Sequence, residues 1–232
     1  MYASTSSPPP FRPQGAVFDL DGLLVDSEGA WSRAEAAVVT SYGVAWDPAI
    51  HAELLGTAPA ASAEQLARRL DAPADEILQR LEAAALEEFA GGVDPRPGAV
   101  ELVTALVGRV PIGVATNSPR LLAERALRST GLHQAIDVLV TAEDVAEPKP
   151  APDIYLAACE RLGVDPARSV GFEDSAVGVA AARAAGLWVV GCPSLPDEPM
   201  DRAHLVVPSL TAVDPAWFDD GQEISRSVAA SA

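Results

Sequence analysis

The feature that most constrains the fold of this chain is a regular alternation of short apolar runs with helical segments in its C-terminal part. The apolar runs have the length and composition of buried strands, and turn residues separate them from the helices. Strands are expected at 16–20, 112–115, 136–140, 169–172, 187–190 and 205–207. Helices are expected at 99–107, 120–128 and 154–162, and between Ser175 and Gly186. Such alternation predicts an α/β fold, in which helices cover both faces of a parallel sheet.

A block of helices interrupts this pattern directly after the first strand. Helices are expected at 27–42, 48–55, 63–70 and 74–90, the third with Ser62 as its N-cap, and the block has no strand signal. We interpret it as a small helical module inserted into the α/β domain. The predicted division is a disordered leader at 1–14, the α/β core at 15–26 and 96–218, the helical module at 27–95 and a disordered tail at 219–232.

Composition narrows the classes of partner. The chain has 232 residues, of which 49% are hydrophobic, and this is enough for a sizeable core. The formal net charge of -17 argues against nucleic acids and anionic membranes as partners, because both bind basic surfaces. The sequence has no apolar run of membrane-spanning length and no signal-peptide pattern. We therefore expect a cytoplasmic protein that is a monomer or a weak homodimer.

Two aspartates stand where the first strand ends. Asp19 and Asp21 follow an apolar run, and Gly22 lets the chain turn sharply after them. The two-residue period of a strand would direct both carboxylates to one side, where they repel by about 4 kcal/mol at an effective dielectric of about 20. Such a pair requires a cation, a shared proton or both. The same four residues are also typical of a strand followed by a simple Asp-Gly turn.

Further polar groups follow the other expected strands. They are Thr116-Asn117-Ser118, Glu173-Asp174-Ser175, and Lys149, which is the only lysine among sixteen basic residues. Each has a structural explanation as a helix cap, a strand end or a solvated turn, but in a parallel sheet all of them reach the ligand-binding edge. Carboxylates suit Mg²⁺, while Thr116, the Asn117 backbone and Lys149 supply donors for a phosphoryl group. Together the groups indicate phosphoryl transfer.

Four segments carry a resemblance to a known family: FDLDGLLVDSE at 18–28, ATNS at 115–118, EPKPAPDIYL at 147–156 and GFEDS at 171–175. In them the chain resembles the haloacid dehalogenase superfamily, in its phosphatase branch close to β-phosphoglucomutase and to sugar phosphatases. The resemblance implies a Rossmann-like, doubly wound core and a helical cap inserted after the first strand. It also implies Mg²⁺-dependent hydrolysis of a small phosphomonoester, such as a sugar phosphate.

The resemblance assigns a role to each group of residues. Asp19 would be the nucleophile that forms an aspartyl-phosphate, and Asp21 the general acid and then the general base. Substrate contacts would come from Gly22, Thr116, Asn117 and Lys149. Mg²⁺ would be bound by Asp19, the backbone carbonyl of Asp21, Glu173 and Asp174. Cap residues that could contact the substrate are Trp31, Arg33, Trp46, His51, Arg68 and Arg69, although packing or solvation also explains most of them.

Other functions share some of these features. Mutases similar to β-phosphoglucomutase carry a histidine where Trp31 stands and basic residues in the loop that matches 54–59, so this alternative is weakened. A receiver-like phosphoacceptor signalling domain would have no cap. A Ca²⁺-binding loop would require further ligands after Gly22, and these are absent.

Overall fold

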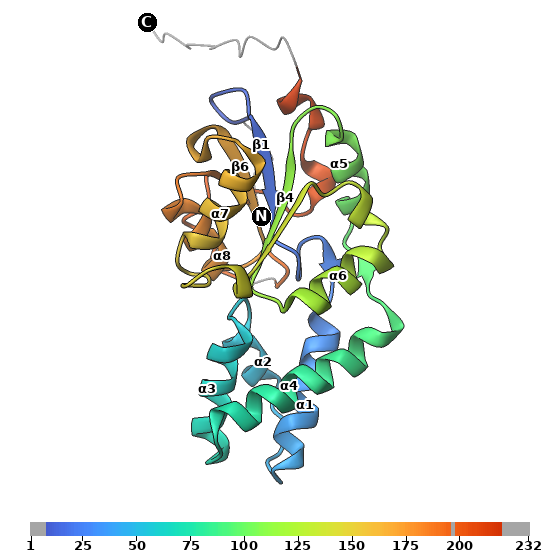
Figure 1. The fold of residues 1–232 in the computed structure, drawn as a ribbon, viewed down its shortest axis with the longest axis vertical. Helices are drawn as coiled ribbons and strands as arrows, with labels where there is room; N and C mark the ends of the chain where they lie inside the picture. Colours follow the sequence, from blue (N-terminus) through green and yellow to red (C-terminus); the bar gives the residue numbers. More distant parts are fainter. Residues whose placement is uncertain (1–7, 196–197, 220–232) are drawn as a thin grey trace, which may run out of the picture.

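The computed structural model describes residues 8–195 and 198–219, which form an α/β core and a helical cap (Figure 1). The core strands are β1 (Gly15–Phe18), β4 (Ile112–Thr116), β5 (Val138–Thr141), β6 (Ser169–Glu173), β7 (Trp188–Gly191) and β8 (Leu205–Val206). The core helices are α5 (Ala99–Leu106), α6 (Arg120–Ser129), α7 (Asp153–Leu162) and α8 (Ala176–Ala184). The cap helices are α1 (Glu28–Ser41), α2 (Pro48–Leu54), α3 (Pro59–Leu70) and α4 (Ala74–Glu88).

Shorter elements connect these parts. Two strands that the sequence analysis missed, β2 (Val25–Asp26) and β3 (Asp94–Pro95), pair antiparallel where the chain enters and leaves the cap. Short 3₁₀ helices lie at Phe89–Gly91, Leu132–Gln134, Ala142–Asp144, Pro166–Arg168, Leu210–Ala212 and Pro215–Phe218.

The core sheet is parallel, with the strand order β5-β4-β1-β6-β7-β8. The chain builds one side of the sheet from β1 through β4 to β5 and then crosses back to β6, so the order reverses at β1. Ligands bind at such reversals in doubly wound sheets. Phe18 of β1 lies opposite Phe172 of β6, and their stacked rings have centroids 4.5 Å apart. The predicted doubly wound α/β fold with an inserted helical cap is confirmed.

Both faces of the sheet are buried. Ala16 and Phe18 pack into the core cluster that contains residues of α5 and α6, whereas Val17 packs into the cluster that contains residues of α7 and α8. Because alternate residues of β1 enter two different cores, the strand is a continuous apolar run in the sequence rather than an alternating one.

The cap helices pack around a separate small core. Helix α4 lies against α1 and α3, and Leu66, Ile77 and Leu81 are among the residues buried there. Helix α3 begins at Pro59, earlier than the predicted start after Ser62. Proline favours the first helical position, because its missing N–H would have no partner there. The Ser62 hydroxyl does not cap the helix and instead lies 2.6 Å from the hydroxyl of Thr57.

The described ends of the chain pack on the core. Phe11 contacts the core cluster, and the N–H of Gln14 donates to the carbonyl of Arg168 at 2.7 Å. Residues 8–14 are therefore ordered against the core rather than part of a disordered leader. Asp219, the first residue of the predicted tail, pairs with Arg109. The remaining residues of the predicted leader and tail, 1–7 and 220–232, lie outside the described residues.

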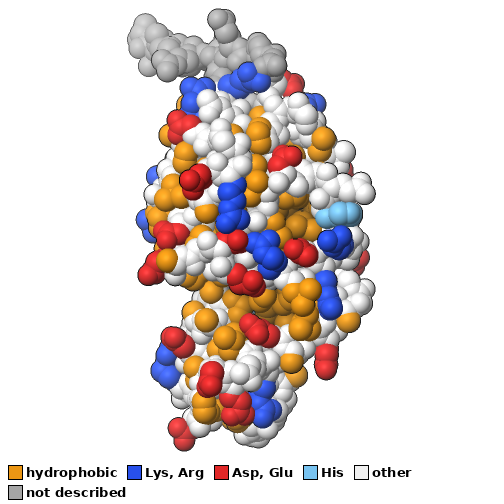
Figure 2. All heavy atoms as spheres, in the orientation of Figure 1, with side chains coloured by type: hydrophobic (Ala, Val, Ile, Leu, Met, Phe, Trp, Pro, Cys, Tyr) orange, Lys and Arg blue, Asp and Glu red, His pale blue; other side chains and the backbone are white. Residues whose placement is uncertain are grey.

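The distribution of surface charge and the hydrophobicity of the helices bear on the expected partners. On the face drawn in Figure 2, basic side chains are scattered among acidic ones and form no continuous basic patch over the described residues. Within the described part of the chain, no helix combines the length and the hydrophobicity that are needed to cross a bilayer.

Candidate active site

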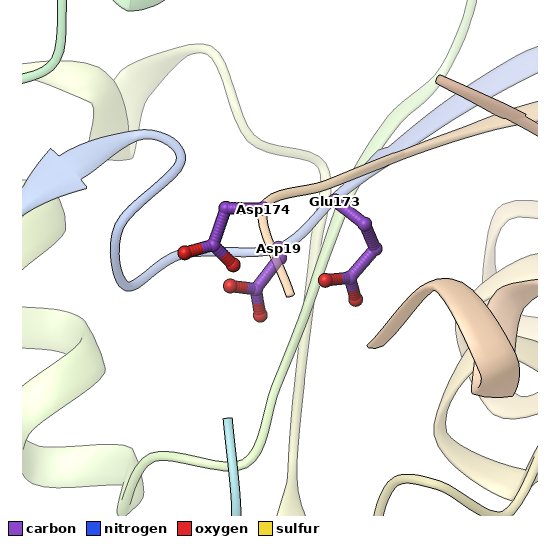
Figure 3. A group of neighbouring side chains, drawn as sticks. All are labelled: Asp19, Glu173 and Asp174. Carbon is purple, nitrogen blue, oxygen red and sulfur yellow. The ribbon is translucent and has the colours of Figure 1, made fainter. Parts of the chain in front are cut away.

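Three acidic side chains meet at the ends of neighbouring strands (Figure 3). Asp19 directly follows β1, Glu173 ends β6, and Asp174 comes next. All three are buried, and one oxygen of each lies within 4.8 Å of the others. Their convergence follows from the pairing of Phe18 with Phe172, which brings the residues after both phenylalanines to one edge. The side chain of Asp21 does not belong to this group.

Lys149, the only lysine of the chain, inserts its ammonium group beside these carboxylates. Its Nζ donates to Oδ1 of Asp19 at 2.5 Å and to Oε1 of Glu173 at 2.7 Å, and its side chain is 3% exposed. Burial disfavours the charge, but Asp19 and Glu173 outweigh it and raise the pKa of Lys149. The lysine therefore stays protonated, and it fixes the orientation of the Asp19 carboxylate.

One ammonium group does not neutralise three buried carboxylates. Burial raises the pKa of Asp19 to about 7 in spite of Lys149, and the charge of Glu173 adds to this effect. Burial, together with the charges of Asp19 and Glu173, raises the pKa of Asp174 well above its usual range. Oε2 of Glu173 is also buried without a hydrogen-bond partner among the described residues. A divalent cation would supply the missing charge and partner, so these residues fit Mg²⁺.

Mg²⁺ is expected to stabilise the protein more at pH 8 than at pH 5. Because the pKa of Asp19 is raised from 3.8 to about 7 in the folded state, folding retains a proton that the unfolded chain has lost. The contribution of Asp19 to the stability of the metal-free protein is therefore full below about pH 4 and is lost as the pH rises through 7, and the raised pKa of Asp174 acts in the same direction. Calorimetry with and without MgCl₂ should give a rise in Tm of several degrees at pH 8 and a much smaller one at pH 5. Equal rises at both pH values would contradict a cation site at these carboxylates.

The Asp21 carboxylate accepts four hydrogen bonds between the cap and the core. Oδ1 accepts from Ser27 Oγ at 2.6 Å and from Trp31 Nε1 at 3.1 Å. Oδ2 accepts from Ser118 Oγ at 2.5 Å and from Thr116 Oγ1 at 3.3 Å. Ser27 and Trp31 lie where the chain enters the cap, whereas Thr116 ends β4 and Ser118 lies just after it. Asp21 therefore connects the two parts of the molecule at the site.

Gly22 has a structural role at the turn after Asp21, and its substrate contact stays a prediction. Its φ of +75° lies in the left-handed region that favours glycine, and a Cβ there would lie 2.1 Å from Oδ2 of Asp174. Its N–H already donates to the carbonyl of Val25 at 2.9 Å, and among the described residues it is not one that lines the pocket. Although the strand ends at Phe18 and the two aspartates have different hydrogen-bond partners, both line one pocket, and burial together with the charge of Asp21 helps to raise the pKa of Asp19.

Asn117 connects the loop that contains Lys149 to the cap. Its Oδ1 accepts from the N–H of Lys149 at 3.0 Å, and its Nδ2 donates to the carbonyls of Gly56 at 3.0 Å and of Lys149 at 3.3 Å. Gly56 belongs to the loop between α2 and α3, so this amide holds a cap loop against the core. Its side chain is thus engaged in structure, and only its backbone remains for the predicted phosphate contact.

Tyr155 is a site residue that the sequence analysis missed. Its hydroxyl donates to Oε1 of Glu173, the oxygen that also accepts from Lys149. Burial and the charge of Glu173 raise the pKa of Tyr155 well above its usual range, so the phenol stays a neutral donor. Its buried place on α7, next to Ile154, is a signal that could have revealed it, because a buried tyrosine hydroxyl requires a partner.

A pocket between the core and the cap brings several of these residues together. Its core wall includes Asp19, Asp21, Thr116 and Lys149, and its cap wall includes Glu28, Trp31, Glu35 and His51. Of the six cap residues considered from the sequence, Trp31 and His51 line the pocket. Arg33 and Arg69 instead form ion pairs with Glu88 and Glu53 on the cap surface.

Comparison with known proteins agrees with this arrangement. Residues 13–186 match the family model of the haloacid dehalogenase-like hydrolases. The chain is 38% identical over 202 residues to validoxylamine A 7'-phosphate phosphatase of Streptomyces hygroscopicus subsp. limoneus, and this alignment covers 85% of this chain and 94% of the relative. It is 35% identical over 181 residues to fructose-1-phosphate phosphatase of Escherichia coli (strain K12), and this alignment covers 77% of this chain and 96% of the relative.

A solved structure agrees as well. CbbY from Rhodobacter sphaeroides, in complex with phosphate, has a TM-score of 0.76 and 29% sequence identity, over 85% of this chain and 95% of that chain. The match of the family model extends from before the strand of Asp19 to beyond the residues of α8, and so includes all four segments that carry the resemblance. The chain therefore belongs to the haloacid dehalogenase-like hydrolase family.

Proposed function

We propose that this protein is an Mg²⁺-dependent phosphatase that hydrolyses a small phosphomonoester of a sugar or a similar metabolite through an aspartyl-phosphate intermediate. The observation that carries the proposal is the buried pair of Asp19 and Lys149 at the ligand-binding edge of the sheet. The pair supports a carboxylate nucleophile beside a cation that a phosphoryl group would contact. The names of the two phosphatase relatives support phosphorylated sugars and related compounds as substrates.

In the first step, Asp19 attacks the phosphorus atom. Lys149 holds Oδ1, and Oδ2 has no hydrogen-bond donor among the described residues, so Oδ2 is the nucleophilic oxygen. The new bond joins Oδ2 to phosphorus as the bond between phosphorus and the alcohol oxygen breaks. Asp21 donates its proton to that oxygen, and the alcohol leaves. Thr116 and Lys149 donate to the oxygens of the phosphoryl group.

In the second step, water hydrolyses the aspartyl-phosphate. Asp21, now a carboxylate, takes a proton from the water while the water oxygen bonds to phosphorus. The bond between phosphorus and the Asp19 oxygen then breaks, and phosphate is released. The donors around Asp21 suit both of its forms, because the hydroxyls of Ser27 and Ser118 can donate to the carboxylate or accept from the acid. Trp31 can only donate, so it favours the carboxylate.

The acidic group would hold the metal during both steps. Mg²⁺ bound by Asp19, Glu173, Asp174 and the backbone carbonyl of Asp21 would offset the negative charge of the phosphoryl group. Tyr155 and Lys149 both donate to Oε1 of Glu173, so they orient this carboxylate and leave Oε2 for the cation.

A phosphosugar mutase is the second candidate, and the close match at 147–156 and 171–175 favours it. A mutase must return the phosphoryl group to a second hydroxyl of the sugar before water arrives. The position where mutases carry a histidine is filled by Trp31, whose indole donates to Asp21 and offers no base for a sugar hydroxyl. This contact favours hydrolysis. A receiver-like role is disfavoured by the four cap helices that cover the site.

A panel of phosphorylated metabolites tests the proposal. With MgCl₂, the protein should release phosphate from p-nitrophenyl phosphate and from a subset of sugar phosphates, and EDTA should stop the release. β-Glucose 1-phosphate distinguishes the mutase, because that activity would give glucose 6-phosphate without net release of phosphate. The absence of Mg²⁺-dependent release from every ester would refute the proposal.

A further inference from the structure

A buried ion pair lies in the cap wall of the pocket and has no part in the phosphoryl chemistry above. His51 Nδ1 of α2 lies 2.7 Å from Oε2 of Glu35 on α1, and the side chains are 15% and 7% exposed. Both residues line the pocket that also contains Asp19. Because charged pairs are costly to bury, a pair in a ligand pocket calls for a reason beyond the packing of the two helices.

Two buried polar atoms next to this pair have no partner. Nε2 of His51 and Oε1 of Glu28 make no hydrogen bond with any described residue, and Glu28 also lines the pocket. The hydrogen bond to Glu35 fixes the histidine ring with Nδ1–H as the donor. This bond raises the pKa of His51, although burial of the ring acts in the opposite direction. Nε2 is then available to a hydroxyl group, as a donor when the ring is charged and as an acceptor when it is neutral, while the Glu28 carboxylate is an acceptor. Buried groups of this kind normally have partners.

We propose that His51 and Glu28, with Glu35 as the positioning residue of the histidine, form the subsite that binds the hydroxyl groups of the leaving alcohol. Nε2 of His51 makes a hydrogen bond with one hydroxyl group, and Glu28 accepts from a second hydroxyl of the same molecule. The substrates are then monophosphates of polyhydroxy alcohols. This inference rests on the proposed phosphatase function and names the substrate class of that same site.

The charge of the pocket wall excludes a second anionic group on the substrate. The carboxylates that line the pocket are Asp19, Asp21, Glu28, Glu35 and Asp174. The basic side chains among the described lining residues are Lys149 and His51, and each is already paired with a carboxylate. A second phosphate or a carboxylate near the cap would face Glu28 and Glu35 without a free cation, and like charges at short range repel. Neutral polyols meet no such cost.

The test compares substrates with and without hydroxyl groups in matched variants. The variants are His51→Ala and Glu28→Ala, and the controls are His133→Ala and Glu53→Ala, which remove an exposed histidine of the core and an exposed glutamate of α2. For each protein, kcat/KM is measured for p-nitrophenyl phosphate and for the sugar or polyol monophosphate that the wild type hydrolyses best. The ratio of the second value to the first reports recognition of the hydroxyl groups alone.

We expect this ratio to fall by at least about tenfold in His51→Ala and in Glu28→Ala and to stay unchanged in the controls. Glu28→Ala removes an unpartnered group and keeps the test open if His51→Ala fails to fold. An unchanged ratio in the folded variants would overturn the inference, as would a wild type that prefers fructose 1,6-bisphosphate to fructose 1-phosphate. Either result leaves phosphatase activity intact, whereas a wild type that hydrolyses no ester refutes the proposed function itself.

Discussion

Replacement of Asp19 by asparagine is expected to lower the rate of phosphate release by at least about 10³-fold. The amide is a poor nucleophile, and Oδ1 loses the charge that pairs with Lys149 at 2.5 Å. The variant also removes one of the three carboxylates that fit the cation. The measurement is the initial rate of p-nitrophenyl phosphate hydrolysis with saturating MgCl₂, and undiminished turnover would refute the mechanism.

The same variant is expected to fold. Because burial raises the pKa of Asp19 to about 7, a neutral side chain at this position relieves repulsion in the metal-free protein above that pH. The Tm of Asp19→Asn at pH 8 without Mg²⁺ should therefore equal or exceed that of the wild type. Asp75→Asn on the exposed first turn of α4 is the matched control and should keep wild-type activity. A loss of activity with a lower Tm would indicate misfolding in place of a lost nucleophile.

The sheet and its helices could be predicted because their sequence patterns are strong. Strands buried on both faces, such as 112–115, are apolar throughout, and glycines such as Gly131 and Gly163 mark the ends of helices. The patterns fail where structure depends on few residues. The two-residue strand Val25–Asp26 is too short for any periodicity, and the start of α3 depends on Pro59, whose effect competes with the capping signal of Ser62.

The catalytic edge could be predicted for a different reason. In a parallel sheet the strand ends converge, so Asp19, Thr116, Glu173 and Asp174 are close together whatever the details of packing. Lys149 was identified as the only lysine of the chain. Contacts that depend on a turn or on a distant helix could not be predicted in this way, because the position of strand ends does not determine them. Asp21 accepts from Trp31 of the cap, and Ser118, for which a helix cap was the alternative explanation, donates to Asp21 while Pro119 takes the N-cap position of α6.

The cap side of the pocket was the least predictable part. Its lining depends on how α1 and α2 pack against each other, and helical periodicity does not fix this angle. The sequence analysis therefore included His51 as a possible contact but did not identify Glu28 or Glu35, which share the pocket with it. Arg33 and Arg69, two of the three cap arginines considered as substrate contacts, are used in ion pairs on the cap surface. Acidic residues at helical spacing cannot be assigned to a pocket until the helices are placed.

Replacement of Lys149 by methionine is expected to remove both activity and much of the stability. Methionine is unbranched and one atom shorter than lysine, and it leaves Asp19 and Glu173 buried without their ammonium partner. Breaking a buried pair on one side costs about 3–5 kcal/mol, and in a protein of this size each kcal/mol lowers Tm by about 2–4 °C. We therefore expect Tm at pH 8 to fall by about 6–20 °C and the rate with p-nitrophenyl phosphate to fall by about 10²–10³-fold.

The dependence of these two losses on pH and Mg²⁺ separates the roles of the lysine. At pH 5 the loss of stability should be smaller, because carboxyl groups with raised pKa values can take up protons when the ammonium is absent. Mg²⁺ at pH 8 should restore part of the Tm, since it supplies positive charge to the same carboxylates, but it should not restore the rate, because the phosphoryl oxygens then lack the ammonium donor. Arg69→Met, which breaks an exposed pair with Glu53, is the control and should change Tm by about 2 °C or less. A Lys149→Met protein that kept its rate would show that the buried ammonium serves folding alone, and the mechanism would then lose the cation that aims its nucleophile.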